Sequence, residues 1–81
     1  MKKEDIIKCY PDDIFLFADG LDKAILGVDQ ETMRVIYSVK KCINCLMRNS
    51  LMDYQEAIEF FDFNTRGAYV GEKTPIWCED L

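Results

Sequence analysis

The sequence predicts a small single α+β domain over residues 1–81, with the element order α-β-β-α-α and an extended C-terminal segment or edge strand. Its 81 residues leave room for one hydrophobic core and no second domain. Apolar residues make up 49% of the chain, which is enough for a packed core and argues against disorder. The apolar spacing is helical near the N-terminus, extended in the middle of the chain and helical again after Ser38.

The N-terminal part is expected to form a short helix and then an extended segment. Ile6, Ile7 and Tyr10 recur at helical spacing before Pro11 stops the turn. Residues 14–17 are a compact apolar and aromatic run between polar breakers, which fits a short buried strand or a docked extended segment.

Residues 24–28 and 33–37 are predicted to pair as a β-hairpin. Both runs are rich in β-branched or bulky side chains, and the polar residues 29–32 between them supply turn formers. The loop is longer than a two-residue turn, so the sequence leaves the strand register open.

Two helices and an extended tail are expected after the hairpin. Ser38 can cap a helix that runs to about Asn49 and carries one apolar face. Asp53 with Glu56 forms a capping-box pattern for a second helix, which ends at Asn64 or Gly67. Glycine and proline interrupt the apolar residues beyond that point, which predicts an extended segment with at most an edge strand.

The charge favours a basic partner and disfavours direct binding to nucleic acid or to anionic membranes. Ten basic and fifteen acidic side chains give a net charge of −5, although the same charge is also ordinary for a soluble small domain. The polar start is not followed by a hydrophobic leader, and no apolar run could cross a bilayer. We therefore expect a protein that is made and kept in a cytoplasm.

We expect no enzymatic activity. The chain contains no histidine, which removes the commonest general base near neutral pH and the usual activators of serine or cysteine nucleophiles. Its glycines do not form a phosphate-binding loop. Two-carboxylate chemistry at Asp12 with Asp13, or at Glu56 with Glu59, stays open as a minor alternative.

The cysteines permit one structural zinc ion. Cys42 and Cys45 have C-x-x-C spacing on a predicted helix, and Cys9 with Cys78 could complete a four-thiolate site. The competing interpretation is that the four thiols are metal-free, buried or partly exposed side chains, since cysteine is among the most buried residue types. A redox role for the pair is a weaker third alternative, because no βαβ pattern surrounds it.

An aromatic anchor is a further candidate for partner binding. Phe60 and Phe63 fall off the predicted core face of their helix, and Tyr69 with Trp77 could join them at the surface. The alternative is that a small core needs these rings for its own packing.

Residues 19–77 resemble a family of short acidic bacteriophage accessory proteins of unassigned function. The similarity is strongest in residues 56–61 and in the tail GAYVGEKTPIW at residues 67–77. This resemblance implies a phage protein acting in the cytoplasm of the infected bacterial host. Small acidic phage proteins often inhibit host defence, and anti-CRISPR proteins that bind a Cas nuclease such as Cas9 are one such class.

The leading hypothesis is an inhibitor that docks an acidic surface on a basic CRISPR effector nuclease and blocks nucleic-acid loading. The alternative is a structural or regulatory oligomerising module, held together by apolar contacts around Phe63 and Trp77. The predicted partner-binding carboxylates lie around the first extended segment and the hairpin turn: Asp12, Asp13, Asp19, Asp22, Asp29 and Glu31.

Overall fold

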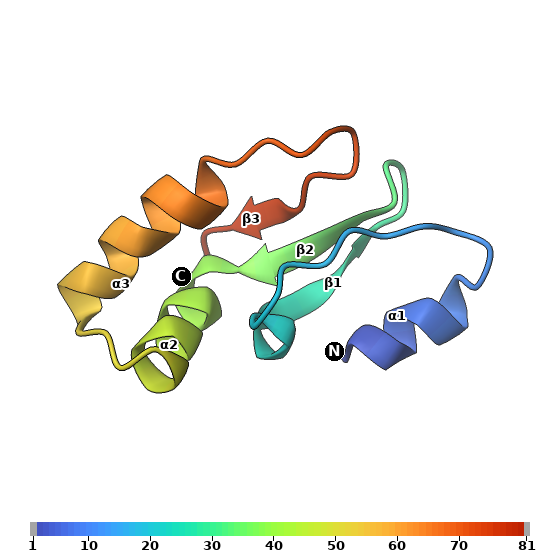
Figure 1. The fold of residues 1–81 in the computed structure, drawn as a ribbon. Coiled ribbons are helices and arrows are strands. Elements are labelled where there is room, and N and C mark those ends of the chain that lie inside the picture. Colours follow the sequence, from blue (N-terminus) through green and yellow to red (C-terminus); the bar gives the residue numbers. More distant parts are fainter. Residues whose placement is uncertain (1, 81) are drawn as a thin grey trace.

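The computed structural model describes residues 2–80 and confirms the predicted α+β class (Figure 1). Helices and strands follow nearly the predicted order, with a short third strand in the C-terminal tail. The elements are α1 (Lys3–Cys9), η1 (Asp22–Ala24), β1 (Ile25–Asp29), β2 (Arg34–Ser38), α2 (Val39–Asn49), α3 (Tyr54–Phe60), η2 (Phe61–Arg66) and β3 (Ile76–Cys78). None of the helices within residues 2–80 has the length and apolar character that crossing a bilayer requires.

The sheet has three strands in the order β1-β2-β3. β1 and β2 form the predicted antiparallel hairpin, in which a bulge between Ile25 and Gly27 shifts the register. β3 pairs with β2 in parallel, which places Trp77 opposite Tyr37. The tail therefore contributes an edge strand, and it lies beside a strand that is about forty residues earlier in the chain.

Tyr37 lies at the centre of the core, where its side chain is completely buried. Its ring centroid is 5.2 Å from that of Trp77, which in turn meets Phe61 edge-on at 5.3 Å. Its hydroxyl oxygen accepts a hydrogen bond from the backbone N–H of Ala18 at 2.7 Å. Tyr37 thus links the sheet directly to the chain that precedes η1, and through Trp77 it links the sheet to the end of α3.

Residues 14–18 form a docked extended segment and not a strand, so the second of the two sequence alternatives holds. Phe15 and Phe17 are half-buried and pack against the core, while Ile14 and Leu16 point outward. Alternate residues face the core as they would in a strand, but the segment is not part of the hydrogen-bond ladder of the three-stranded sheet.

Both helix caps that the sequence predicts are present. The Ser38 hydroxyl accepts from Lys41 N at the start of α2, and Asp53 with Glu56 forms the capping box of α3. Beyond Phe60 the helix widens into the π-helix η2, where Gly67 N donates to Asp62 O at 3.2 Å. The second helix therefore ends at the predicted glycine, but its last part has the wider backbone spacing.

The C-terminal segment is fastened to the start of α2. The Ser38 hydroxyl lies 2.7 and 2.8 Å from the two carboxylate oxygens of Asp80, to which it donates. This hydrogen bond, with smaller help from the Lys40 backbone and charge, lowers the pKa of Asp80 below its usual 3.8. The contact holds β3 against β2 while Asp80 is ionised.

Replacing Tyr37 by Phe should lower the free energy of unfolding by about 1–3 kcal/mol, because the Ala18 N–H loses its acceptor in a partly buried place. Urea unfolding of the full chain measures this change. Tyr10→Phe is the matched control, since it deletes a hydroxyl whose hydrogen bond to Gln30 is exposed. Equal losses in the two variants would contradict the central role of the Tyr37 hydroxyl.

The stabilising effect of Asp80 should depend on pH. A carboxyl group whose pKa is lowered by folding stabilises the fold above its usual pKa, and this contribution disappears as the pH falls through the lowered value. The urea midpoints of the parent chain and of Asp80→Ala should therefore differ near pH 7 and converge below pH 3.8. A difference that stays constant across this range would show that ionised Asp80 does not hold the tail.

Candidate binding groove

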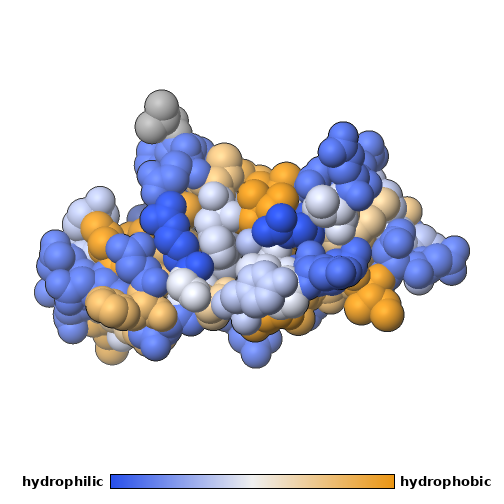
Figure 2. All heavy atoms as spheres, turned by 90° about the horizontal axis from the view of Figure 1, so that it is seen from above, coloured by the Kyte–Doolittle hydropathy of each residue, from blue (hydrophilic) through white to orange (hydrophobic). Residues whose placement is uncertain are grey.

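An open groove of about 390 Å³ lies between the docked segment and the end of α3. Residues 16–21 form one wall, and η2 with the chain after it forms the other. Figure 2 views the molecule from above, on the side of α3 and the following loop, and shows apolar patches interrupted by hydrophilic atoms. The main apolar lining residues are Leu16, Leu21, Phe60, Val70, Pro75 and Trp77.

The floor of the groove is aromatic and tightly held. Trp77 contributes to the lining, and its ring also packs against those of Tyr37 and Phe61. Its indole N–H is buried and has no acceptor within residues 2–80. A buried donor without a partner has a free-energy cost, so the indole ring is held by packing against its neighbours and not by a side-chain hydrogen bond.

Apolar side chains on the walls remain open to solvent. Leu16 is 38% exposed, Phe60 40% and Val70 56%. Phe63 and Tyr69 on the same elements reach 84% and 80%. Such a concentration of large exposed apolar side chains is typical of an interaction surface, because each of them gains free energy when water is excluded.

A second hollow continues the groove along α3. Met52, Glu56, Glu59 and Phe63 line it, and it shares Phe60 and Asn64 with the groove. We call the two together the groove surface.

The charges of the groove surface are all negative. Asp19 is the charged lining residue of the groove, and Glu56 and Glu59 are those of the second hollow. The nearby Arg66 is engaged elsewhere, with Glu79 at 2.7 Å and Asp62 at 3.5 Å. A ligand of this surface therefore meets apolar rings beside carboxylates.

The predicted partner-binding carboxylates fall into two groups. Asp12, Asp13, Asp29 and Glu31 lie towards the hairpin turn, where Gln30 bonds to Tyr10 at 3.1 Å. The carboxylate of Asp29 has a local role there: the Thr32 hydroxyl and the Glu31 N–H donate to it and lower its pKa.

Asp19 and Asp22 lie at the other end of the docked segment. Burial is the main cause that raises the pKa of the Tyr37 hydroxyl, and the charges of Asp22 and Asp19 add to it. Asp19 is the one of the six predicted acids that lines the groove. From the sequence, Glu56 and Glu59 are candidates only as paired carboxylates. Their position on one helix beside Phe60 and Phe63 was the signal that could have placed them at a binding surface.

The predicted aromatic anchor is divided between the surface and the core. Phe60, Phe63 and Tyr69 are exposed around the groove, whereas Trp77 is half-buried in its floor. Core packing thus holds for Trp77, and the exposure that an anchor requires holds for Phe60, Phe63 and Tyr69, whose role in partner binding stays a prediction.

The four cysteines are not gathered into a metal site. Cys9 is exposed at the end of α1, Cys42 and Cys45 are buried in α2, and Cys78 is half-buried in β3. Within residues 2–80, no three His, Cys, Asp or Glu side chains lie close enough to hold a metal ion. As placed, these thiols do not fit a tetrahedral zinc set, and the zinc ion stays a prediction of the sequence.

Comparisons with protein-family models, with curated proteins and with solved structures found no match to this chain. Its function therefore has to be inferred from its own geometry. The groove surface offers apolar rings, one carboxamide, one hydroxyl and three carboxylates, from Asn64, Thr65, Asp19, Glu56 and Glu59. This set can bind an apolar and cationic ligand by burial and charge.

The thiols should differ strongly in reactivity. Burial, with smaller contributions from Cys45 and Asp80, raises the pKa of Cys42 to about 12, so its thiol stays protonated and inert. Iodoacetamide should modify exposed Cys9 first and Cys42 last, as followed by mass spectrometry of the native chain, and all four should react in denaturant. Protection of Cys9 that a chelator removes would instead support the zinc site.

Proposed function

We propose that this chain is a non-enzymatic protein-binding module whose groove surface receives an apolar segment of a basic partner protein. The observation that carries the proposal is the combination of exposed rings with carboxylates, and the absence of any lysine or arginine from the described lining. Burial of the apolar rings drives association, although lost rigid-body and side-chain freedom offsets part of the gain, while the carboxylates select cationic neighbours.

The exposed rings make the best anchors for such a partner. Phe60, Phe63 and Tyr69 lose little conformational freedom on binding, because aromatic side chains have few rotatable bonds. Trp77 below them is already fixed by Tyr37 and Phe61, so the floor needs no rearrangement to accept a ligand. Preformed contacts of this kind reduce the entropic cost of association.

Charge narrows the class of partner. The net charge of −5 adds long-range attraction for a basic surface to the local effect of Asp19, Glu56 and Glu59. Proteins that hold nucleic acid present such surfaces, and an acidic chain seated there repels phosphate groups. We therefore propose that the chain blocks nucleic-acid loading by its partner.

A CRISPR effector nuclease of the infected bacterial host is the specific partner that we propose. The resemblance of residues 67–77 to phage accessory proteins favours this choice, and such nucleases hold their guide duplex in a positively charged channel. Tyr69 and Val70, which lie within that stretch, are exposed beside the groove. The inhibitor would act in the bacterial cytoplasm.

Phe63→Ser should raise the concentration of the chain that half-inhibits target-DNA binding by the purified effector at least about tenfold, because it removes an exposed anchor. Ile14→Ser is the matched control: Ile14 is 82% exposed but does not line the groove surface, so inhibition should stay within about twofold.

The same inhibition assay tests whether the carboxylates of the groove surface contribute to binding. Glu59→Lys should raise the half-inhibiting concentration most at low salt, whereas Glu4→Lys on α1, which changes the net charge by the same amount, should raise it less. Equal effects of Phe63→Ser and Ile14→Ser, or of the two charge reversals, would place the interface elsewhere. An effector that keeps full DNA binding with excess chain would contradict the proposed partner.

A second copy of the chain is the alternative occupant, and the exposure of Phe63 and Tyr69 is the observation that favours it. Opposed copies would bring Asp19, Glu56 and Glu59 together, so such an assembly should strengthen as salt screens them. Sedimentation at low and high salt distinguishes the two: docking on a basic protein weakens with salt, and self-association does not.

A further inference from the structure

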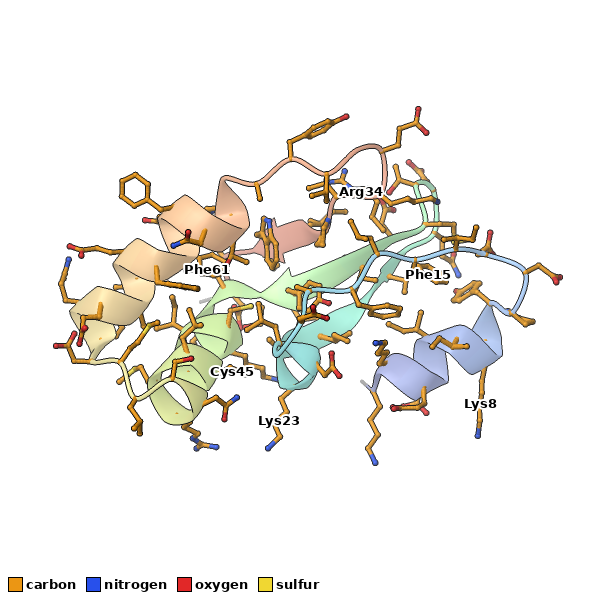
Figure 3. The ribbon with its side chains drawn as sticks, viewed as in Figure 1. Lys8, Phe15, Lys23, Arg34, Cys45 and Phe61 are labelled. Atoms are coloured by element: carbon orange, nitrogen blue, oxygen red, sulfur yellow. The ribbon has the colours of Figure 1, made fainter. Side chains whose placement is uncertain are left out.

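A cationic hollow of about 180 Å³ lies beside α2 and shares no residue with the groove surface. Figure 3 shows Lys23 extending from η1 next to α2, where Cys45 is labelled. Lys23, Lys41 and Arg48 line the hollow together with Asn44 and Asn49. Three positive charges and two carboxamides thus converge in a chain that is acidic as a whole.

The helix spacing explains how one face of α2 forms this hollow. Lys41, Asn44 and Arg48 follow one another at intervals of three and four residues, so they lie along one stripe. The whole of α2 carries no acidic residue. Lys23 joins them because η1 packs against α2, and the combination comes from two elements that are distant in the sequence.

These cations have no counterion in the part of the chain that the structure describes. No carboxylate lines the hollow, and no ion pair or side-chain hydrogen bond is formed by Lys23, Lys41 or Arg48 within residues 2–80. The like charges around the hollow repel one another, and attraction to an anion placed between them offsets this repulsion. The hollow is therefore electrostatically complementary to a multiply charged anion.

We propose that this cationic hollow binds the phosphate group of a small phosphorylated ligand. The guanidinium fork of Arg48 can donate two parallel hydrogen bonds to phosphate oxygens, and the lysines add point charges. The amide groups of Asn44 and Asn49 can donate to further oxygens.

The size of the ligand follows from charge screening. A small dianion lies within a Debye length, about 8–10 Å, of all three cations and senses mainly their local field. A nucleic-acid strand extends beyond that distance and meets the surface of a chain with net charge −5. A small phosphate ester is therefore favoured over a polyanion.

The hollow lies by the C-terminal end of α2, so anion binding has to come from its side chains. The unpaired carbonyls at the end of α2 carry partial negative charge and disfavour an anion beside Arg48 and Asn49. Binding therefore depends on the three cations and not on the helix backbone.

The test is titration of the ¹⁵N-labelled full chain with pyrophosphate, followed by amide chemical shifts, with sodium chloride of equal ionic strength as reference. Saturable shifts at Lys41, Asn44 and Arg48 are expected with pyrophosphate alone. Lys41→Gln and Arg48→Gln should each weaken binding by about fivefold. Lys8→Gln is the matched control, because it removes the same charge from α1, and it should leave binding unchanged.

Equal shifts with chloride, or an equal loss of binding in Lys8→Gln, would overturn the proposal. Inorganic phosphate should bind the same residues more weakly than pyrophosphate, since it carries less charge. A short single-stranded oligonucleotide that binds these residues more tightly than pyrophosphate would overturn the assignment to a small ligand. Phe63→Ser should bind pyrophosphate normally, so this test stands apart from the one on the groove surface.

Discussion

The burial of Tyr37 is the constraint on which the rest of the molecule depends. A phenol at the centre of a small core has to satisfy its hydroxyl, and the backbone N–H of Ala18 does so at 2.7 Å. That bond fixes residues 14–18 across the sheet, while the ring supports Trp77 and, through it, Phe61. One wall of the groove, its floor and the position of η2 thus follow from a single side chain.

The path of the C-terminal segment is the second determinant of the groove. Polar contacts hold this segment to residues that lie earlier in the chain. The side chains of Arg34 and Lys73 donate to the carbonyl oxygens of Thr74 and Thr32, respectively. The Ser38 hydroxyl donates to the carboxylate of Asp80. These bonds anchor both ends of the last segment. Val70 lies before the first anchor and lines the groove, and its neighbour Tyr69 is exposed.

Local signals in the sequence were sufficient for the helices and the hairpin, since Ser38, Asp53 and Glu56 act on neighbouring residues as caps. The parallel pairing of β3 was not predictable, because partners some forty residues apart leave no local pattern. The groove was partly predictable: Phe60 and Phe63 visibly left the core face of their helix. The cationic hollow was not, because Lys23 joins α2 only through tertiary packing.

The π-helix η2 determines how the molecule would respond to a change of length at one place. Hydrogen bonds in a π-helix join residues five apart instead of four, so one wide turn holds one residue more than an α-helical turn. Deleting one residue between Phe61 and Arg66 would therefore allow ordinary winding without a large rotation of the chain that follows. Arg66 would still face Glu79, and the GAYVG segment would leave the helix in its present direction. Homologues one residue shorter here would thus keep the shape of the groove if its lining side chains were retained.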